Sequence, residues 1–392
     1  MKRRTFVFSV LLPFTAVACG ASSSAPATAE PADASPASTA ASFTPVDVPL
    51  QGTAPFWHAA VTIGGQSFSL SVDTGSSTTV VASASCTSCS GAHLYQTSAD
   101  AVDEKTPVSG VYDGGDMTWH GNIVEDSIVV GGTSPVRARI GTIASQKNFL
   151  DMMASDGILG LGPTRLAAPG TSSVLDALVA SGMPNVFAVA LCPGSAHLWL
   201  GGFDATETTA PIQWAPLLPD TKELPFYNVK VAGLAIDKTP LDVPDATWGT
   251  ALVDTGGPSF DVPQAALDAV VASLSANGEF TKLFGDPKTY YAQARCVASK
   301  ATAADVDAVL PPLTLVLGDD ASVHVDLPAS QSYVLPSSEF GPLANADGWC
   351  PGLASISGTP KFDIGSSLLR SLLVVFDRAN GRFGVAPRPA CH

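Results

Sequence analysis

Two acidic tripeptides of the chain carry the residue types needed for general acid–base chemistry. Asp73-Thr74-Gly75 follows the alternating stretch 68–72, and Asp254-Thr255-Gly256 follows the apolar stretch 251–253. Alternation predicts a half-buried strand, and a glycine directly after a strand predicts a sharp turn, because glycine makes such turns without steric cost. Each tripeptide is therefore expected to hold a carboxylate at the tip of a strand.

Two carboxylates held close together titrate as a pair. The charge of one raises the pKa of the other, so that over a range of pH the pair holds a single proton. The charged member can take a proton from water while the neutral member donates one to a carbonyl oxygen. This chemistry needs no metal, no cofactor and no nucleophilic side chain. The alternative is two ordinary turns that each carry a capping aspartate.

Composition places the pair in a large globular protein rich in strands. The 392 residues suffice for two domains with sizeable cores, and they are 46% hydrophobic but only 14% charged. The 35 glycines and 31 prolines imply many turns, as all-β folds require. A net charge of −15 argues against nucleic acid as a partner, since phosphate contacts need Lys and Arg. No Gly-x-Ser-x-Gly or His-Glu-x-x-His motif occurs, which disfavours serine hydrolases and zinc proteases.

The first 44 residues predict export rather than a folded core. Residues 1–18 begin with a basic stretch and continue as an apolar run too short to span a bilayer, which is typical of a secretory signal peptide. Residues 16–20 resemble the lipobox of bacterial lipoproteins, so we expect Cys19 to be acylated; plain cleavage is the alternative. Residues 19–44 are mainly Ala, Ser, Pro and Thr and predict a flexible tether to the cell envelope, at the outer membrane or cell surface. They lack the basic residues of an inhibitory prosegment.

From residue 45 the pattern changes to strand, turn, strand. Residues 59–63 precede Gly64-Gly65, and residues 128–130 precede Gly131-Gly132. Helical patterns are few, with 174–180 and 264–274 as the best candidates. The fold class predicted for this part of the chain is all-β.

Longer motifs around the two turns resemble the pepsin-like (family A1) aspartic peptidases. The turns lie 181 positions apart, from 73 to 254, and the other matching segments are 156–162, 362–365 and 374–385. The resemblance covers about 45–391. It implies a bilobal fold in which two β lobes of the six-stranded type, 45–218 and 219–392, are related by a pseudo-twofold axis with a cleft between them. It also implies a monomer that acts on polypeptides, with Asp73 and Asp254 catalytic on separate lobes.

The resemblance assigns supporting roles around the two aspartates. Thr74 and Thr255 are expected to cross-link the turns through hydroxyl-to-backbone hydrogen bonds, and Gly75 and Gly256 to let the substrate backbone approach. The residue after each tripeptide usually carries a hydroxyl that bonds the outer oxygen of the carboxylate. The first motif keeps it as Ser76, but the second has Gly257. This loss predicts a higher pKa for Asp254 and lower activity.

A flap over the pair is expected at 112–117, which matches the family's Tyr-x-x-Gly-x-apolar pattern. Tyr112 would cover the aspartates, and the backbone of Asp113 and Gly114 would bind substrate amides. Val80 stands where the family often has a Trp that supports the flap tyrosine, so Trp119 is the expected partner instead. The alternative is an ordinary Gly-rich hairpin with a packed Tyr.

The cysteine count fits an exported protein, because six of the seven cysteines remain if Cys19 carries lipid. Family position implies three disulfides, Cys86–Cys89, Cys192–Cys391 and Cys296–Cys350. A redox or zinc site at Cys86 and Cys89 with His93 is the alternative. No second Cys pair or His cluster completes such a zinc site, so we predict no metal.

The main functional prediction is an aspartic endopeptidase that acts at acidic pH on polypeptides. One alternative is a catalytically weak or inactive binding or inhibitor protein of the same fold on the cell surface, which the Gly257 position favours. Relatives of that kind usually lose a catalytic Asp, and this chain keeps both. The other alternative is a neutral-pH processing enzyme for one surface substrate. By resemblance, large apolar residues are expected on both sides of the scissile bond.

Overall fold

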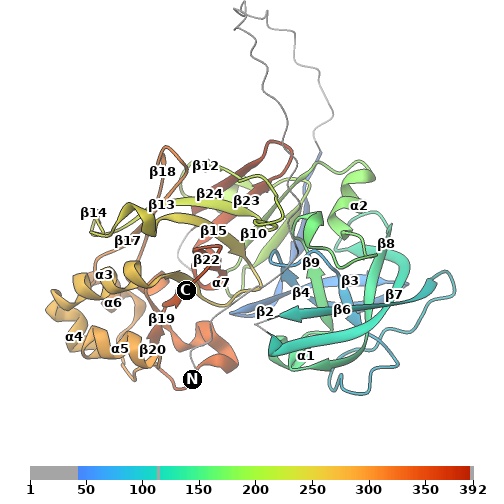
Figure 1. Cartoon of the computed structure of the whole chain (residues 1–392), viewed down its shortest axis with the longest axis horizontal. Helices are drawn as coiled ribbons and strands as arrows, with labels where there is room; N and C mark the ends of the chain where they lie inside the picture. The colour runs from blue at the N-terminus through green and yellow to red at the C-terminus, as the bar shows by residue number, and fades with distance from the viewer. Residues whose placement is uncertain (1–42, 113–114, 389–392) are drawn as a thin grey trace, which may run out of the picture.

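The structure, a computed structural model, describes residues 43–112 and 115–388. Over these ranges the chain is mainly strand, and it forms two lobes that lie side by side in Figure 1. The first half of the chain, coloured blue to green, builds the lobe on the right, and most of the second half builds the lobe on the left. The predicted all-β, bilobal fold is confirmed.

The first lobe is built on one sheet in the order β2-β3-β4-β9-β5-β8-β7-β6, in which β3 also pairs with β7. β4 carries the first acidic motif at its end and runs parallel to β9, so that Asp73 lies opposite Gly160. Two short helices, α1 (Phe149–Met153) and α2 (Val174–Ala180), follow β8 and β9. The strands are β2 (Gln51–Thr53), β3 (Phe56–Ile63), β4 (Gln66–Asp73), β5 (Val80–Ala82), β6 (Val102–Tyr112), β7 (Met117–Val130), β8 (Val136–Lys147) and β9 (Gly157–Gly160).

The second lobe repeats this arrangement around β15. Its sheet runs β18-β17-β13-β15-β22-β16-β21, with β14 paired to β13. β15 runs parallel to β22, so that Asp254 lies opposite Gly365, as Asp73 lies opposite Gly160. The strands are β13 (Asn228–Ile236), β14 (Thr239–Pro240), β15 (Gly249–Asp254), β16 (Phe260–Pro263), β17 (Leu313–Leu317), β18 (Val323–Leu327), β21 (Leu353–Ile356) and β22 (Phe362–Gly365).

The second lobe also carries most of the helices. The stretches predicted as helical form α2 and α3 (Gln264–Ser275). Three further helices of seven residues each were not predicted, because segments this short carry little periodicity: α4 (Gly278–Phe284), α5 (Pro287–Gln293) and α6 (Ala303–Val309). Their side-chain caps, Asn277, Asp286 and Thr302, are the local signals that fix where they begin. A small hairpin of β19 (Val334–Pro336) and β20 (Trp349–Pro351) lies beyond them, and α7 (Ser366–Leu369) follows β22.

A third sheet is shared by the two halves of the chain. Its order is β1-β11-β10-β23-β24-β12, with β10 (Val186–Ala190) antiparallel to β23 (Leu372–Asp377). The other strands are β1 (Val46–Pro49), β11 (His197–Leu200), β12 (Gln213–Pro216) and β24 (Arg382–Pro387). Over the described ranges, the expectation of six-stranded lobes is therefore wrong in detail, since each lobe has an eight-stranded sheet and the six-stranded sheet joins them. The predicted lobe boundary at 218/219 lies between β12 and β13 and stays a prediction.

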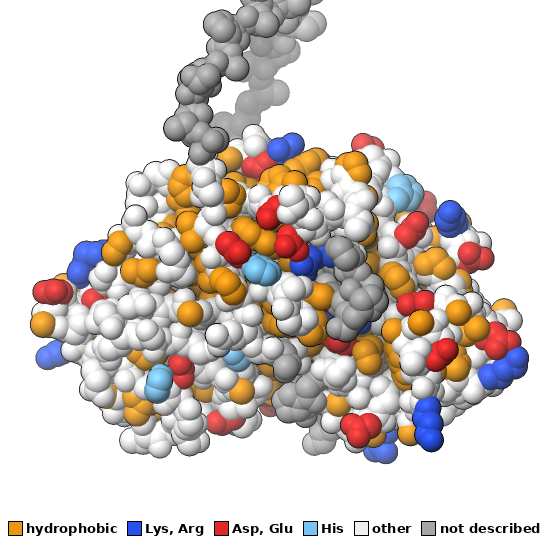
Figure 2. All heavy atoms as spheres, turned by 180° about the vertical axis from the view of Figure 1, so that it is seen from behind, with side chains coloured by type: hydrophobic (Ala, Val, Ile, Leu, Met, Phe, Trp, Pro, Cys, Tyr) orange, Lys and Arg blue, Asp and Glu red, His pale blue; other side chains and the backbone are white. Residues whose placement is uncertain are grey.

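Most buried apolar side chains of both lobes and of the shared sheet form one large cluster, and two smaller clusters lie in the first lobe and in the shared sheet. Phe187 of β10 stacks on Phe376 of β23 with ring centroids 4.6 Å apart, which packs the two halves of the chain together. The face in Figure 2 is largely uncharged, with acidic and basic side chains scattered over it. No helix within 43–112 or 115–388 is long and apolar enough to cross a membrane.

Candidate active site

The ends of β4 and β15 bring the two acidic turns together. A side chain on Gly75 would place its first carbon 2.6 Å from Asp254 Oδ1, and one on Gly256 would place it 2.7 Å from Asp73 Oδ1. Each glycine thus lies against the carboxylate of the other motif, at a distance that no Cβ could occupy. The two aspartates, which come from different halves of the sequence, face each other across this point.

Four hydrogen bonds connect the two turns. The Thr74 hydroxyl donates to Val253 O and the Thr255 hydroxyl to Val72 O, both at 2.8 Å. Each threonine hydroxyl also accepts from the backbone amide of the other threonine at 3.0 Å. Both threonines are buried, so the cross-link is shielded from water and fixes how the carboxylates face each other.

The donors around the two carboxylates differ. Asp73 accepts from the Gly75 amide through Oδ1 and from the Ser76 hydroxyl through Oδ2, both at 2.7 Å. Asp254 accepts from the Gly256 amide at 2.8 Å. Gly257 supplies no hydroxyl to match Ser76, so the outer oxygen of Asp254 lacks that donor.

This difference sets the order in which the two acids titrate. Burial raises the pKa of both, and the charge on Asp73 adds to the effect at Asp254, whose pKa rises to about 8. At Asp73, hydrogen bonds from Ser76 and Gly75 oppose the effect of burial. A hydrogen bond between the two side chains lowers the pKa of Asp73 and raises that of Asp254. Asp254 is therefore the member that keeps the shared proton.

Tyr112, at the end of β6, lies next to the pair. Burial raises its pKa and the charge of Asp73 adds to this, whereas Trp119 and Ser76 oppose the shift. Its ring packs on Phe149 of α1, with centroids 5.0 Å apart. The contact with Trp119 fits the partner expected for this tyrosine. The other two predicted flap residues, Asp113 and Gly114, lie outside the described residues.

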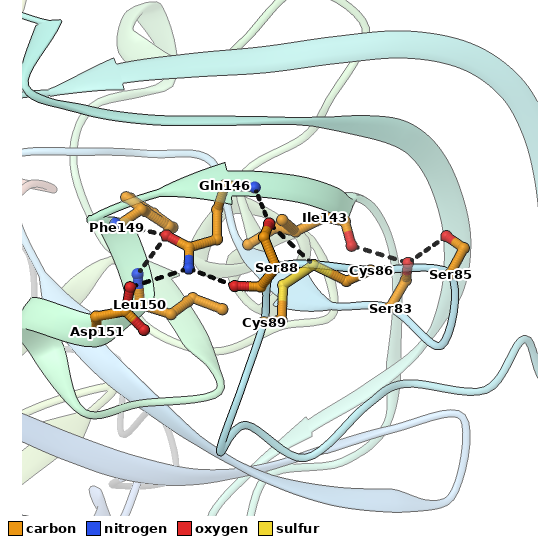
Figure 3. The surroundings of a disulfide bond; sticks show 10 residues. All are labelled: Ser83, Ser85, Cys86, Ser88, Cys89, Ile143, Gln146, Phe149, Leu150 and Asp151. Atoms are coloured by element: carbon orange, nitrogen blue, oxygen red, sulfur yellow. Dashed lines mark hydrogen bonds between the residues drawn. A yellow bond between two sulfur atoms is a disulfide. The ribbon is translucent and has the colours of Figure 1, made fainter.

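A small disulfide loop is hydrogen-bonded, through Gln146, to the start of α1 (Figure 3). Cys86 and Cys89 are bonded, and Ser88 between them accepts through Oγ from the Gln146 amide at 2.8 Å. The Gln146 side chain donates to Ser88 O and accepts from the Phe149 amide, both at 2.7 Å. The loop thus fixes the start of α1, which carries Phe149 against Tyr112.

Of the two remaining predicted cysteine pairs, one is formed within the described residues. Cys296 and Cys350 are bonded within the second lobe. Cys192 is buried, and its predicted partner Cys391 lies outside the described residues, as does Cys19. Over 43–112 and 115–388, no group of three His, Cys, Asp or Glu residues is placed to hold a metal ion.

One acidic residue near the pair lies within the matching segment 362–365 but was given no role in the site from the sequence. Asp363 of β22 lies beside Asp254, and burial raises its pKa, with the charges on Asp254, Asp261 and Asp73 adding to the effect. The sequence holds one signal for it, since an aspartate interrupts an otherwise apolar segment, 362–364. A charged group that is expected to be buried needs a partner. This need is the signal that could have linked Asp363 to the site.

Comparison with known proteins agrees with this geometry. A family described as eukaryotic aspartyl protease matches residues 57–388. The chain is 25% identical to an aspartic protease of Phaffia rhodozyma over 86% of this chain and 77% of that protein. It is 26% identical to embryonic pepsinogen of Gallus gallus, over 88% and 84% of the two chains. It is also 26% identical to cathepsin E of Oryctolagus cuniculus, over 84% and 80%. With the family match covering most of its length, the chain belongs to the pepsin-like family of eukaryotic aspartyl proteases.

Proposed function

We propose that the protein is an aspartic endopeptidase that hydrolyses peptide bonds with a water molecule activated between Asp73 and Asp254. The observation that carries this is the facing pair of carboxylates, which four threonine hydrogen bonds hold together and of which one keeps a proton. Family membership and relatives named as peptidases support it.

The two acids have different roles because one is ionised and the other is protonated. Ionised Asp73 takes a proton from water as the oxygen attacks the scissile carbonyl carbon, while Asp254 donates its proton to the carbonyl oxygen. The product is a neutral tetrahedral diol. When the C–N bond breaks, Asp73 gives its proton to the leaving amine and the diol returns one to Asp254. Both acids then regain their starting state.

This division predicts the pH range of activity. The acidic limb follows protonation of Asp73, and the alkaline limb follows loss of the proton from Asp254. Because the pKa of Asp254 is raised to about 8, we propose activity at acidic pH that extends toward neutrality.

Cleavage of a denatured protein at acidic pH, inhibited by a statine-type transition-state analogue, tests the proposal against the binding-protein alternative, which the Gly257 position favours. A chain that binds polypeptides without cleaving them at any pH would contradict the proposal. A pH profile that peaks near neutrality would favour a processing enzyme instead.

Gly257→Ser should restore the missing donor and move the alkaline limb of kcat/KM to lower pH. A hydroxyl bonded to Asp254 favours the charged form and so lowers its pKa, by about half a unit to one unit if the bond contributes about 0.5–1.5 kcal/mol. The first carbon of such a side chain would lie 3.1 Å from Asp254 Oδ2, so the hydroxyl can reach it. The pH dependence of cleavage measures the shift. Gly257→Ala, which fills the same space without a donor, should leave the limb where it is, and an equal shift in both variants would contradict this explanation.

We also propose that residues 1–18 are a secretory signal, that Cys19 is acylated, and that 19–44 tether the protease to the cell envelope. The support is the order of basic, apolar and small residues before Cys19 and the low-complexity stretch after it. Cys19→Ser should move the protein from the membrane fraction to the soluble fraction, because acyl chains anchor by burying methylene groups. Fractionation measures this, with Ser22→Ala as the control. A membrane-bound Cys19→Ser protein would contradict the anchor.

A further inference from the structure

The position of Asp363 follows from two strand pairings. In β22 it lies opposite Leu252 of β15, two residues before the catalytic Asp254, and opposite Asp261 of β16. A side chain at Gly257 would begin 3.1 Å from Asp254 Oδ2 and 3.5 Å from Asp363 Oδ2. The two carboxyl groups thus lie next to the same space. A serine or threonine at position 257 would place its hydroxyl there.

The surroundings of Asp363 favour the neutral acid. Its Oδ1 is shielded from solvent and has no hydrogen-bond partner among the described residues. The charged groups that act on it are all acids: Asp254 at the end of β15, Asp261 on β16 and Asp73 at the end of β4. Asp261 is already bonded to the Ser259 hydroxyl at 2.6 Å.

The positive charge next to β22 in the sequence does not neutralise the charges of these acids. Lys361 of the same segment directs its ammonium to Trp248 O, at 3.2 Å, and to Ala246 O. Burial and the charges of Asp254, Asp261 and Asp73 raise the pKa of Asp363, which favours its protonated form.

We propose that Asp363 is a third acid of the site, a positioning residue whose protonated carboxyl donates to the outer oxygen of Asp254 across the space at Gly257. It would hold Asp254 from one side as Ser76 holds Asp73 from the other, and so supply part of the stabilisation that a hydroxyl at position 257 would give. This inference rests on the proposed peptidase function. This role would explain why an acid whose Oδ1 is shielded from solvent lies next to Gly257.

The test is a double-mutant cycle between positions 257 and 363. Leu matches Asp in the number of side-chain atoms but cannot donate, whereas Asn keeps a donor. In the natural background, Asp363→Leu should lower kcat/KM about tenfold or more, because it removes a hydrogen bond to a group that becomes charged during the reaction. In the Gly257→Ser background the same change should cost less than about threefold, since the serine already supplies the donor. Asp363→Asn should stay within about threefold of the wild type. An equal loss in both backgrounds, or Asn as harmful as Leu, would overturn the proposal.

A second readout separates this inference from the peptidase function. An acid with a raised pKa keeps its proton when folded but loses it when unfolded, so it makes the fold less stable as pH rises above about 4. The Tm of the Asp363→Leu variant should therefore increase relative to that of the wild type as the pH rises above about 4. A Tm difference that does not change with pH would overturn the proposal whether or not the wild type cleaves peptides. Absence of cleavage by the wild type alone would contradict the proposed function.

Discussion

Replacing Asp73 by Asn should lower kcat/KM by about a thousandfold or more, because the variant has no base to take a proton from water. A general acid or base raises the rate about 10²–10⁴-fold, and Asp73 is also one of the two residues that share the proton. Asn nearly matches the shape of Asp, and its oxygen can accept from the Gly75 amide while its NH2 group donates to the Ser76 hydroxyl oxygen. The loss would then come from chemistry rather than from the fold, as kinetics and a thermal melt of the same preparation can show.

Asp254→Asn provides the matched comparison, because it removes the other half of the pair and should cause a loss of similar size. Asp268→Asn, on the exposed face of α3, should leave the rate unchanged. An Asp73→Asn protein that cleaves as fast as the wild type would exclude the catalytic pair and leave a binding protein as the better interpretation.

Replacing Thr255 by Val should both destabilise the fold and slow cleavage. The change keeps the shape of the side chain but removes the hydrogen bond to Val72 O and the acceptor of the Thr74 amide. Each buried group left without its partner costs about 1–3 kcal/mol, so we expect the free energy of unfolding to fall by about 2–6 kcal/mol. Cleavage should slow as well, because small displacements of catalytic groups reduce the rate strongly.

Thr255→Ser is the control for this prediction, since it keeps the hydroxyl and removes only a methyl group. Chemical denaturation of the three proteins measures the difference, and kcat/KM measures the effect on the pair. If Val and Ser variants are equally stable and equally active, the cross-link does not hold the two turns together.

The sequence motifs located the central features of the site because those features are local. Asp73 and Asp254 each end a strand with recognisable alternation or apolarity, and the glycine after each is required where the other carboxylate approaches to 2.6–2.7 Å of its Cβ position. The pKa of Asp254 is raised in the direction expected from the absence of a hydroxyl at Gly257, with burial and the charge of Asp73 as the main causes. These inferences need only neighbours in the chain and the family resemblance.

Features that depend on distant pairings were missed. Asp363 becomes a neighbour of Asp254 only because β22 runs parallel to β15, more than a hundred residues apart in sequence. The support of Tyr112 by Phe149, and of Phe149 by the disulfide loop, likewise joins three separate segments. Helices α4 to α6 were missed because seven residues give too few repeats for periodicity to show.

The sheet shared by the two halves has a consequence for biosynthesis. One edge of β10 pairs with β23. This edge of β10 therefore has no partner until the ribosome has added about 180 more residues. An apolar strand left open for so long can pair with other chains, and pairing over such a distance along the sequence is slow. Aggregation and the demand for chaperones should therefore peak in nascent chains that end before residue 372.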